Sequence, residues 1–407
     1  MTEPLVQTPA LARVSRGALC SGCGACAALV PDAVKMVISE KGYLRPAQTA
    51  SIRAAQDDAI AQICPGLLQD VATEGRKDHA LWGPYVEMRM GFATDPELRF
   101  KGSSGGALSG LLAWLIESGE VASVLTNKAD PDRAVANQPT LARTRADVVV
   151  SAGSRYAPSA PLAALDLAGD GPTAFVGKPC DAVALRAMQT RDPALAERFP
   201  LVLSFFCAGV PSLQGGEEVL ASLGMTPSDT TAFRYRGHGW PGHATATATD
   251  GSEASMTYHE SWGKILSSKV QHRCKLCADG TGVDADIVCA DAWESDDQGY
   301  PMFDEADGVS LIVARTAKGA DILRRSEAAG AIETKSFDIT HLAAIQPGQT
   351  RRRQALFARL VGQRLLGRPA PDYRGLSILA AARTGSLKWS LRNFVGMIRR
   401  GISSRPE

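Results

Sequence analysis

Three cysteines spaced two residues apart, Cys20, Cys23 and Cys26, constrain this chain more than any other feature. The spacing lets one short loop reach three corners of an iron–sulfur cube, which needs four thiolates. Bacterial ferredoxin runs supply the fourth from a nearby Cys-Pro pair, but here that place reads Val30-Pro31. The next cysteine, Cys64, is followed by proline, so we predict that it completes a [4Fe–4S] site. A zinc knuckle or a disulfide set is the alternative.

Four further cysteines form a second set. Cys180 and Cys207 each follow a short apolar run that is typical of a buried strand. Ligands collect at the carboxyl ends of strands in α/β sheets. Together with Cys274 and Cys277 these two residues give four thiols, which predicts a second [4Fe–4S] cluster, with inert buried cysteines as the alternative. The ninth cysteine, Cys289, lies within an apolar run and is expected to be a core residue.

A glycine-rich loop, residues 100–106, opens a helical stretch at residues 107–118. The free N–H groups and the positive dipole end of such a helix start suit a phosphate or pyrophosphate. A helix with an ordinary serine cap is the alternative. The predicted cofactor-binding residues are those of this loop together with cations, an aromatic residue and a strand-end carboxylate: Lys101, Ser103, Ser104, Gly105, Gly106, Arg155, Tyr156, Lys178 and Asp291.

A second glycine-rich loop, residues 234–243, carries arginines, aromatic residues and two histidines. Its composition suits a loop that covers a flavin or an anionic substrate. His238 and His243 can exchange protons near neutral pH, so they are the candidate catalytic residues. The alternative for each is a surface histidine without a chemical role.

The 407 residues are enough for two domains, and 45% of them are hydrophobic, as in ordinary soluble proteins. We find neither a charged-then-apolar leader nor an apolar run near the ~20 residues that span a bilayer, which predicts a cytoplasmic protein. Nine cysteines in that compartment indicate metal or redox work. We expect an α/β fold with a loose arm at residues 1–19, a ferredoxin-like segment at 18–75, a catalytic domain at 80–345 and a basic helical tail at 346–407.

The charge of the chain is unevenly distributed. From Arg351 to the end there are thirteen Lys or Arg and two Asp or Glu, which leaves 31 basic and 41 acidic residues before it. Such a tail can meet an anionic membrane, nucleic acid or the acidic body of the protein. Its helical pattern favours peripheral contact of residues 384–407 with the inner face of a membrane, and we expect no nucleic-acid partner. The predicted apolar face consists of Leu387, Leu391, Phe394, Val395, Ile398 and Ile402.

These motifs together resemble the beta-subunit family of the coenzyme F420-reducing hydrogenases and F420-linked formate dehydrogenases. Relatives of that family include 7-hydroxymethyl chlorophyll a reductase and the ferredoxin-dependent divinyl chlorophyllide reductase. The resemblance covers about residues 18–315. It rests on Cys20–Cys26, Gly42–Pro46, Gly102–Gly106, Gly177–Cys180, Phe206–Ser212, Cys274–Cys277, Ala285–Ile287 and Asp291–Trp293.

The resemblance implies FAD and [4Fe–4S] clusters in a flavin-dependent reductase. Electrons would come from a ferredoxin-like donor and leave to an organic acceptor that the sequence does not identify. The chain departs from the family at Val30, which replaces the nearby cysteine, and nothing in it identifies a pocket for the deazaflavin coenzyme. The alternative is a non-catalytic electron-transfer or scaffold subunit of a larger complex or oligomer.

Overall fold

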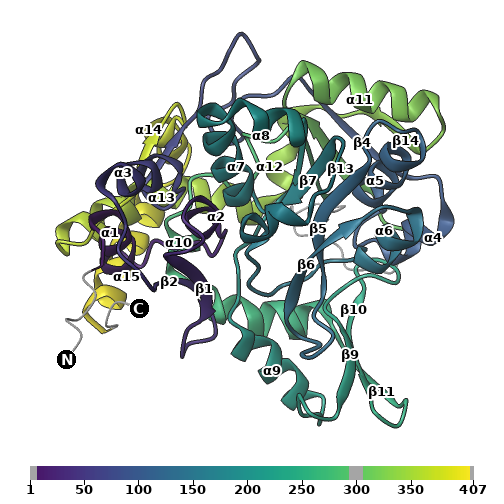
Figure 1. The fold of residues 1–407 in the computed structure, drawn as a ribbon, viewed down its shortest axis with the longest axis horizontal. Helices are drawn as coiled ribbons and strands as arrows, with labels where there is room; N and C mark the ends of the chain where they lie inside the picture. The colour runs from purple at the N-terminus through teal and green to yellow at the C-terminus, as the bar shows by residue number, and fades with distance from the viewer. Residues whose placement is uncertain (1–6, 293–305, 404–407) are drawn as a thin grey trace.

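An eight-stranded mixed sheet forms the centre of the computed structural model, which describes residues 7–292 and 306–403 (Figure 1). The spatial order of its strands is β14 (Ile332–Ser336), β4 (Glu87–Ala93), β13 (Ser310–Ala314), β12 (Ile287–Asp291), β8 (Leu201–Phe205), β7 (Thr173–Gly177), β5 (Ser123–Ala129) and β6 (Asn137–Ala142). The neighbours β12, β8, β7 and β5 run parallel, and the other pairings are antiparallel. The predicted α/β class is confirmed.

Helices cover both faces of this sheet, so its inner strands are apolar on both sides. Phe175 of β7 belongs to the core on one face together with α7 (Pro179–Arg191). Its neighbour Val176 points to the other face, where α5 (Ala107–Glu117) and α11 (Ala317–Ala328) pack. All five residues of β7 are buried, which explains why this strand is a continuous apolar run in the sequence.

A smaller antiparallel sheet of three strands lies beside the large one (Figure 1). It has its own core, to which Leu220, Phe233 and Tyr235 contribute. Its elements are β9 (Thr230–Arg234), β10 (His243–Ala248), β11 (Glu253–Thr257), α9 (Leu213–Ser222), η2 (His259–Ile265) and η3 (Leu266–Lys269). Short helices elsewhere in the central part are α4 (Pro96–Lys101), α6 (Arg145–Ser151), η1 (Pro161–Leu167), α8 (Pro193–Arg198), η4 (Ile339–His341) and α12 (Leu342–Ile345).

The two ends of the chain pack against each other. Leu11 and Ile60 share one buried core with Leu356 and Met397, and β3 pairs in parallel with β15. The N-terminal elements are α1 (Pro9–Arg16), α2 (Ala25–Leu29), β1 (Val34–Ile38), β2 (Leu44–Gln48), α3 (Ala54–Ile63) and β3 (Leu68–Asp70). Their neighbours late in the chain are α10 (His272–Lys275), α13 (Pro347–Leu365), β15 (Asp372–Arg374), α14 (Ile378–Arg383) and α15 (Leu387–Ser403).

The prediction of a loose arm at residues 1–19 is wrong for its described part. Helix α1 lies there, and its Ala10, Leu11 and Val14 are buried. Two turns of helix are too short to show a clear period, and the segment is ordered by tertiary packing against α3. Trp293, the last residue of the motifs in the sequence, lies outside the described residues. No helix among the described residues has both the length and the apolar character needed to cross a bilayer.

Candidate functional site

Residues at the carboxyl ends of the parallel strands build the candidate site. Lys178 and Cys180 follow β7, Cys207 follows β8, and Asp291 ends β12. Because these three strands are parallel neighbours, their carboxyl ends lie at one edge of the sheet. The antiparallel β13 begins at the same edge with Ser310, which pairs with Asp291. This is the edge where the sequence predicted that ligands would bind.

The first cysteine set, Cys20, Cys23, Cys26 and Cys64, is gathered by two elements. The loop at residues 20–24 and the first turn of α2 carry three thiols, and α3 ends at the residue before Cys64. Burial raises the pKa of Cys23 to about 12, and the charge of Cys64 adds to the rise. Burial also raises the pKa of Cys26, with contributions from the other three. The four thiols thus influence one another's ionisation, which places them in one region of the fold.

Backbone N–H groups point at these sulfurs. The N–H of Gly22 donates to Sγ of Cys20 over 3.4 Å, and the N–H of Gly66 favours the ionised form of Cys64. Such donors stabilise a thiolate relative to a thiol. Gly24 has a φ of 89°, and a Cβ there would lie 2.7 Å from a backbone nitrogen of η1. Glycine is therefore needed for the loop to fold tightly around the thiols.

The second cysteine set, Cys180, Cys207, Cys274 and Cys277, is brought together from two strand ends and α10. Burial raises the pKa of Cys207 to about 12, and Cys274 is the next largest cause. Burial raises the pKa of Cys277 as well. Sγ of Cys274 accepts a hydrogen bond from the N–H of Val210 over 3.4 Å. Donors again face a sulfur, so this set has the same character as the first.

Gln271, which no motif in the sequence indicates, connects the two sets. Its Nε2 donates to the backbone oxygen of Ser21 over 3.2 Å and lies 3.7 Å from Sγ of Cys274. Burial is the largest cause of the raised pKa of Cys180, and the charge of Cys23 contributes. The two sets therefore adjoin, which is the arrangement that transfer of electrons between two centres needs.

Arg273, which also belongs to no recognisable motif, lies beside both sets. Its side chain is 3% exposed, and it donates to the backbone oxygen of Pro65 over 2.6 Å and to the hydroxyl of Tyr373 over 2.8 Å. Its positive charge opposes the rise in the pKa of Cys64 in the first set and of Cys277 in the second. A fixed cation is thus shared by the two groups of thiols.

Helix α13 holds the loops that carry the second set. Nη1 of Arg352 donates to the backbone oxygen of Cys207 over 2.5 Å, and Nη2 donates to that of Cys274 over 3.2 Å. Nε2 of Gln349 also donates to the oxygen of Cys207, over 3.1 Å. Part of the basic charge that the sequence suggested for a surface tail therefore points inward, at the cysteine loops.

The two sets have the chemistry that [4Fe–4S] clusters require. All eight thiols are free, and four are available in each group. In the described part of the chain, the buried hydroxyl of Ser21 has no hydrogen-bond partner, and it lies between two cysteines, where a cluster sulfide could accept from it. No three His, Cys, Asp or Glu side chains among residues 7–292 and 306–403 surround a single ion. In a [4Fe–4S] cube each thiolate binds a different iron, so the four sulfurs need not converge on one ion.

Cys289 stands apart from both sets. It lies in β12, within the core that also contains Ile312 and Leu203. Burial alone raises its pKa, to about 12, without a contribution from another cysteine. The prediction that Cys289 is a core residue is confirmed.

The glycine-rich loop lies at the same sheet edge as the strand-end residues. Ser104 donates through Oγ to the backbone beside β13 over 2.7 Å, and Ser154 donates to Oγ of Ser103 over 2.8 Å. Gly105 has a φ of 67°, and a Cβ there would lie 3.0 Å from backbone atoms of residues 308–310. Helix α5 begins after this loop without an acidic residue in its first turn. The positive end of its dipole therefore faces the loop uncompensated.

Three predicted cofactor-binding residues have partners within the protein. Asp291 pairs with the buried Arg236 over 2.7 Å. Arg155 donates to two backbone oxygens of residues 134–136, each over 2.8 Å. The ring of Tyr156 packs 4.8 Å from the nearest neighbouring ring centroid. These side chains hold the loops at the edge of the sheet, and their contact with a cofactor remains a prediction.

The two candidate histidines and Lys101 lie on the surface side of this region. The exposed His238 has a φ of 58°, and its ring centroid is 5.2 Å from that of Phe100, which lies at the end of α4 just before the glycine-rich loop. Partial burial lowers the pKa of His238. The exposed His243 starts β10, and Lys101 pairs with Glu97 over 3.0 Å. His238 is thus brought to the loop, and the proton-transfer role of both histidines remains a prediction.

Lys178 lies with the cysteines. Its buried Nζ contacts Oδ2 of Asp181 at 2.7 Å and Oγ of Ser159 at 2.9 Å. Burial opposes the positive charge, but Asp181 and Cys180 outweigh burial and raise the pKa of Lys178. The side chain is therefore a fixed cation beside the second cysteine set, and a cofactor contact would have to form there.

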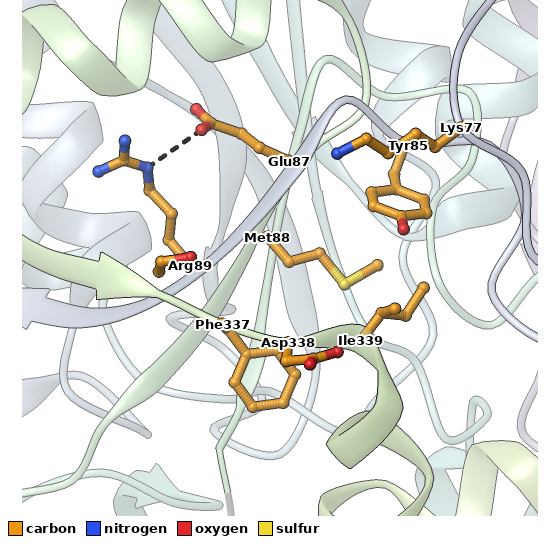
Figure 2. Close-up of a pocket in the computed structure, with 9 residues that line it drawn as sticks. Lys77, Tyr85, Glu87, Met88, Arg89, Phe337, Asp338 and Ile339 are labelled. Atoms are coloured by element: carbon orange, nitrogen blue, oxygen red, sulfur yellow. Dashed lines mark ion pairs between the residues drawn. The ribbon is translucent and has the colours of Figure 1, made fainter.

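A cavity of about 250 Å³ opens where β4 begins and β14 ends (Figure 2). Lys77, Tyr85 and Met88 line it, and Arg89 pairs with Glu87 over 3.4 Å at its border. Among the described residues, its lining includes none of the predicted site residues. This cavity is separate from the edge that carries the cysteines and the glycine-rich loop.

Two family models match the chain. The model for the N-terminal part of the coenzyme F420 hydrogenase/dehydrogenase beta subunit matches residues 88–166, and the model for its C-terminal part matches residues 171–340. Together they span more than half of the chain. The glycine-rich loop and the second cysteine set lie inside the matched ranges. The first cysteine set and helices α13 to α15 lie outside them.

Individual proteins agree with these models. The coenzyme F420 hydrogenase subunit beta of Methanothermobacter thermautotrophicus is 23% identical over 301 residues, which are 71% of this chain and 99% of that protein. A solved structure, the xenon-derivatized F420-reducing [NiFe] hydrogenase complex from Methanosarcina barkeri, matches with a TM-score of 0.54 and 19% identity. The match covers 70% of this chain and 96% of the other and shows a shared fold. The resemblance seen in the sequence is thus confirmed: the chain belongs to the coenzyme F420 hydrogenase/dehydrogenase beta-subunit family.

Proposed function

We propose that this protein is an iron–sulfur flavoprotein oxidoreductase. It would take electrons from a ferredoxin-like donor, conduct them through two [4Fe–4S] clusters to FAD, and reduce an organic acceptor. The observation that carries the proposal is that two groups of four thiols adjoin through Gln271 at the sheet edge that also holds the glycine-rich loop. Membership in a family of hydrogenase and dehydrogenase subunits supports oxidoreductase chemistry.

The chain itself would hold and shield the two clusters. Cys20, Cys23, Cys26 and Cys64 would ligate one cluster, and the second set would ligate the other. Backbone N–H groups that donate to the sulfurs would keep the ligands ionised. Arg352 would fix the loops of the second set from α13. Ligand loops fixed in this way need little rearrangement when an electron arrives, which favours fast transfer.

The glycine-rich loop and the start of α5 would bind the pyrophosphate of FAD. Backbone N–H groups at a helix start, with the positive dipole end behind them, suit that group. The Arg236–Asp291 pair would hold the second glycine-rich loop beside it. Bound FAD exchanges single electrons with clusters and a hydride with an organic molecule. His238 lies beside the loop at Phe100, where it could move the accompanying proton.

A non-catalytic role in a larger assembly is the second candidate. The relatives that match are a hydrogenase subunit and a chain of a hydrogenase complex, so this chain could pass electrons to a partner that carries the reaction. Turnover by the isolated chain distinguishes the two roles. A catalytic subunit should oxidise dithionite-reduced viologen when coenzyme F420 or another two-electron acceptor is added. A purely conducting subunit should stay reduced until its partner protein is supplied.

The composition of the anaerobically purified protein is the first test. We expect a brown protein with about eight iron atoms and one FAD per chain, because each of two clusters holds four irons. Iron and sulfide would be measured by mass spectrometry and colorimetry, and flavin by its absorbance after release. A content of only four iron atoms per chain would show that one of the two proposed clusters is absent. Stoichiometric zinc without iron would overturn it.

Removal of the positive charge of Arg273 should lower the reduction potentials of both clusters. Replacing Arg273 by glutamine deletes a buried positive charge, so adding an electron becomes harder and both reduction potentials should fall by tens of millivolts. The Arg273→Lys variant keeps the charge and should stay near the wild-type values. A redox titration followed by electron paramagnetic resonance measures both. A shift in only one cluster, or an equal shift in the lysine variant, would show that the charge of Arg273 is not shared.

A further inference from the structure

One side of helix α15 is already occupied by the protein. Met397 is fully buried, and Asn393 accepts from Nη2 of Arg359 on α13 over 2.8 Å. Nε1 of Trp389 donates to the backbone oxygen of Arg351 over 3.2 Å. Helix α15 lies within the predicted tail, and it packs on α13 through Met397 and Asn393, which the predicted apolar face did not include. Four of the six residues of the predicted apolar face therefore remain exposed after α15 has packed on α13.

The opposite side of α15 exposes an apolar stripe, which we define as Leu387, Leu391, Val395 and Ile402. Their exposed fractions are 85%, 61%, 45% and 76%. Spacings of four and seven residues place side chains along one side of a helix. Single exposed apolar residues are ordinary, but four in one line on a terminal helix form a continuous contact surface. The other two residues of the predicted face, Phe394 and Ile398, are half-buried, and Ile398 lies on the same side of the helix as the stripe.

Cations surround the stripe. Lys388, Arg392 and Arg399 are exposed on α15 itself. At the C-terminal end of this helix, Nη2 of Arg368 donates to the backbone oxygen of Gly401 over 2.7 Å. A pocket of about 410 Å³ opens at the same place, and we call it the arginine pocket. It is lined by Arg16, Arg364, Gly367, Arg368 and Pro369. The exposed Leu365 adjoins Arg364 in the sequence.

We propose that the α15 stripe and the arginine pocket dock this protein on an anionic lipid bilayer. The apolar side chains would enter the boundary between headgroups and acyl chains, and the arginines would face the lipid phosphates. Figure 1 shows α15 at one end of the molecule beside α1, the helix that ends with Arg16 of the arginine pocket. In Figure 1 the small sheet of β9 to β11 lies at the lower right, far from α15 at the left.

The charge around the stripe favours an anionic bilayer over a second copy of the chain, and the apolar stripe favours it over nucleic acid. Asp372 is the one acidic residue in residues 351–403, so a second copy placed on the stripe would bring cations against cations. Helix α13 of the same chain already covers the other side of α15, as the buried Met397 and the Arg359–Asn393 hydrogen bond show. Nucleic acid would use the cations but would leave the apolar stripe in water. An anionic bilayer satisfies both the charge and the apolar surface.

Flotation of the complete, cofactor-loaded protein with vesicles tests the proposal. We expect it to float with vesicles of phosphatidylcholine and 30% phosphatidylglycerol at low salt and to stay at the bottom with phosphatidylcholine alone. The double variant Leu391→Ser/Ile402→Ser should lose binding by about tenfold or more, because each lost side chain removes apolar burial. Val150→Ser, on α6 and 70% exposed, is the matched control and should float like the wild type.

A second pair of variants tests the arginine pocket. Arg16→Ala/Arg364→Ala should lower binding to the anionic vesicles by about twenty-five-fold, since each of the two cations near such a surface contributes about fivefold. Lys35→Ala/Lys335→Ala removes the same charge from exposed strand positions and should change binding far less. Wild-type protein that stays at the bottom with all vesicles would overturn the proposal. So would a dimer that the stripe variant converts to a monomer, because a second copy would then cover the stripe.

Discussion

Replacing Cys64 by serine should remove one of two clusters and lower the iron content from about eight to about four atoms per chain. The hydroxyl has the size of the thiol but is a poor ligand for iron, so the first set would keep three thiolates. The second set should retain its cluster because its four thiols come from other loops. Iron analysis and the spectrum of the remaining cluster measure the effect. Bound FAD should stay near one per chain.

Cys289→Ser is the control for this experiment. It makes the same exchange of sulfur for oxygen, but at a buried position in β12. A hydroxyl in that core lowers the free energy of unfolding by about 1–3 kcal/mol without touching a ligand. Iron content should therefore remain at the wild-type value. If both variants lost the same amount of iron, the assignment of ligand and core cysteine would be wrong. If Cys64→Ser kept all its iron, the fourth ligand would lie elsewhere.

The cysteine sets could be predicted because much of their information is local. Two-residue spacing within one loop, and a cysteine directly after an apolar strand, are visible in the sequence, and the sheet then brings Cys180 and Cys207 to one edge. The contacts that join the sets could not be predicted in this way. Gln271 and Arg273 lie far from Ser21 and Pro65 in the chain and meet them only in the folded protein.

The tail illustrates the same limit. Its helical period was readable, but the period alone does not tell which side packs on the body. Met397 and Asn393 turn toward α13, and this choice depends on the surface of α13 rather than on α15 itself. Arg352 likewise looked like surface charge, whereas its guanidinium bonds the oxygens of Cys207 and Cys274. Net charge counted along a sequence thus overstates what reaches the surface.

The glycine-rich loop was recognised from its composition, and its geometry changes how its role should be tested. Gly105→Asp would be the obvious way to repel a pyrophosphate. A Cβ at Gly105, however, would lie 3.0 Å from three backbone atoms, and the φ of 67° disfavours any side chain. Loss of FAD from that variant could therefore reflect a distorted loop. Ser103 has ordinary backbone geometry and already carries a side chain at the same loop.

Ser103→Asp should weaken FAD binding by at least about tenfold. The hydroxyl of Ser103 accepts from Ser154 beside the start of α5, so an aspartate there places a negative charge near the predicted position of the pyrophosphate. Two like charges about 4 Å apart repel by up to about 4 kcal/mol near a protein surface, which is more than a tenfold loss requires. The measurement is FAD per chain after gel filtration, with a dissociation constant from titration of the FAD-free protein.

Ser103→Asn separates the charge from the size of the new side chain. Asparagine fills the same space as aspartate without the charge, so this variant should keep FAD much more tightly than Ser103→Asp, and added salt should narrow the gap by screening. Both variants should retain wild-type iron, since neither cysteine set involves Ser103. Equal losses in the two variants would mean that bulk, not charge, disturbs the loop. Full FAD in Ser103→Asp would mean that the pyrophosphate does not bind at the start of α5, because a carboxylate at this position would otherwise oppose it.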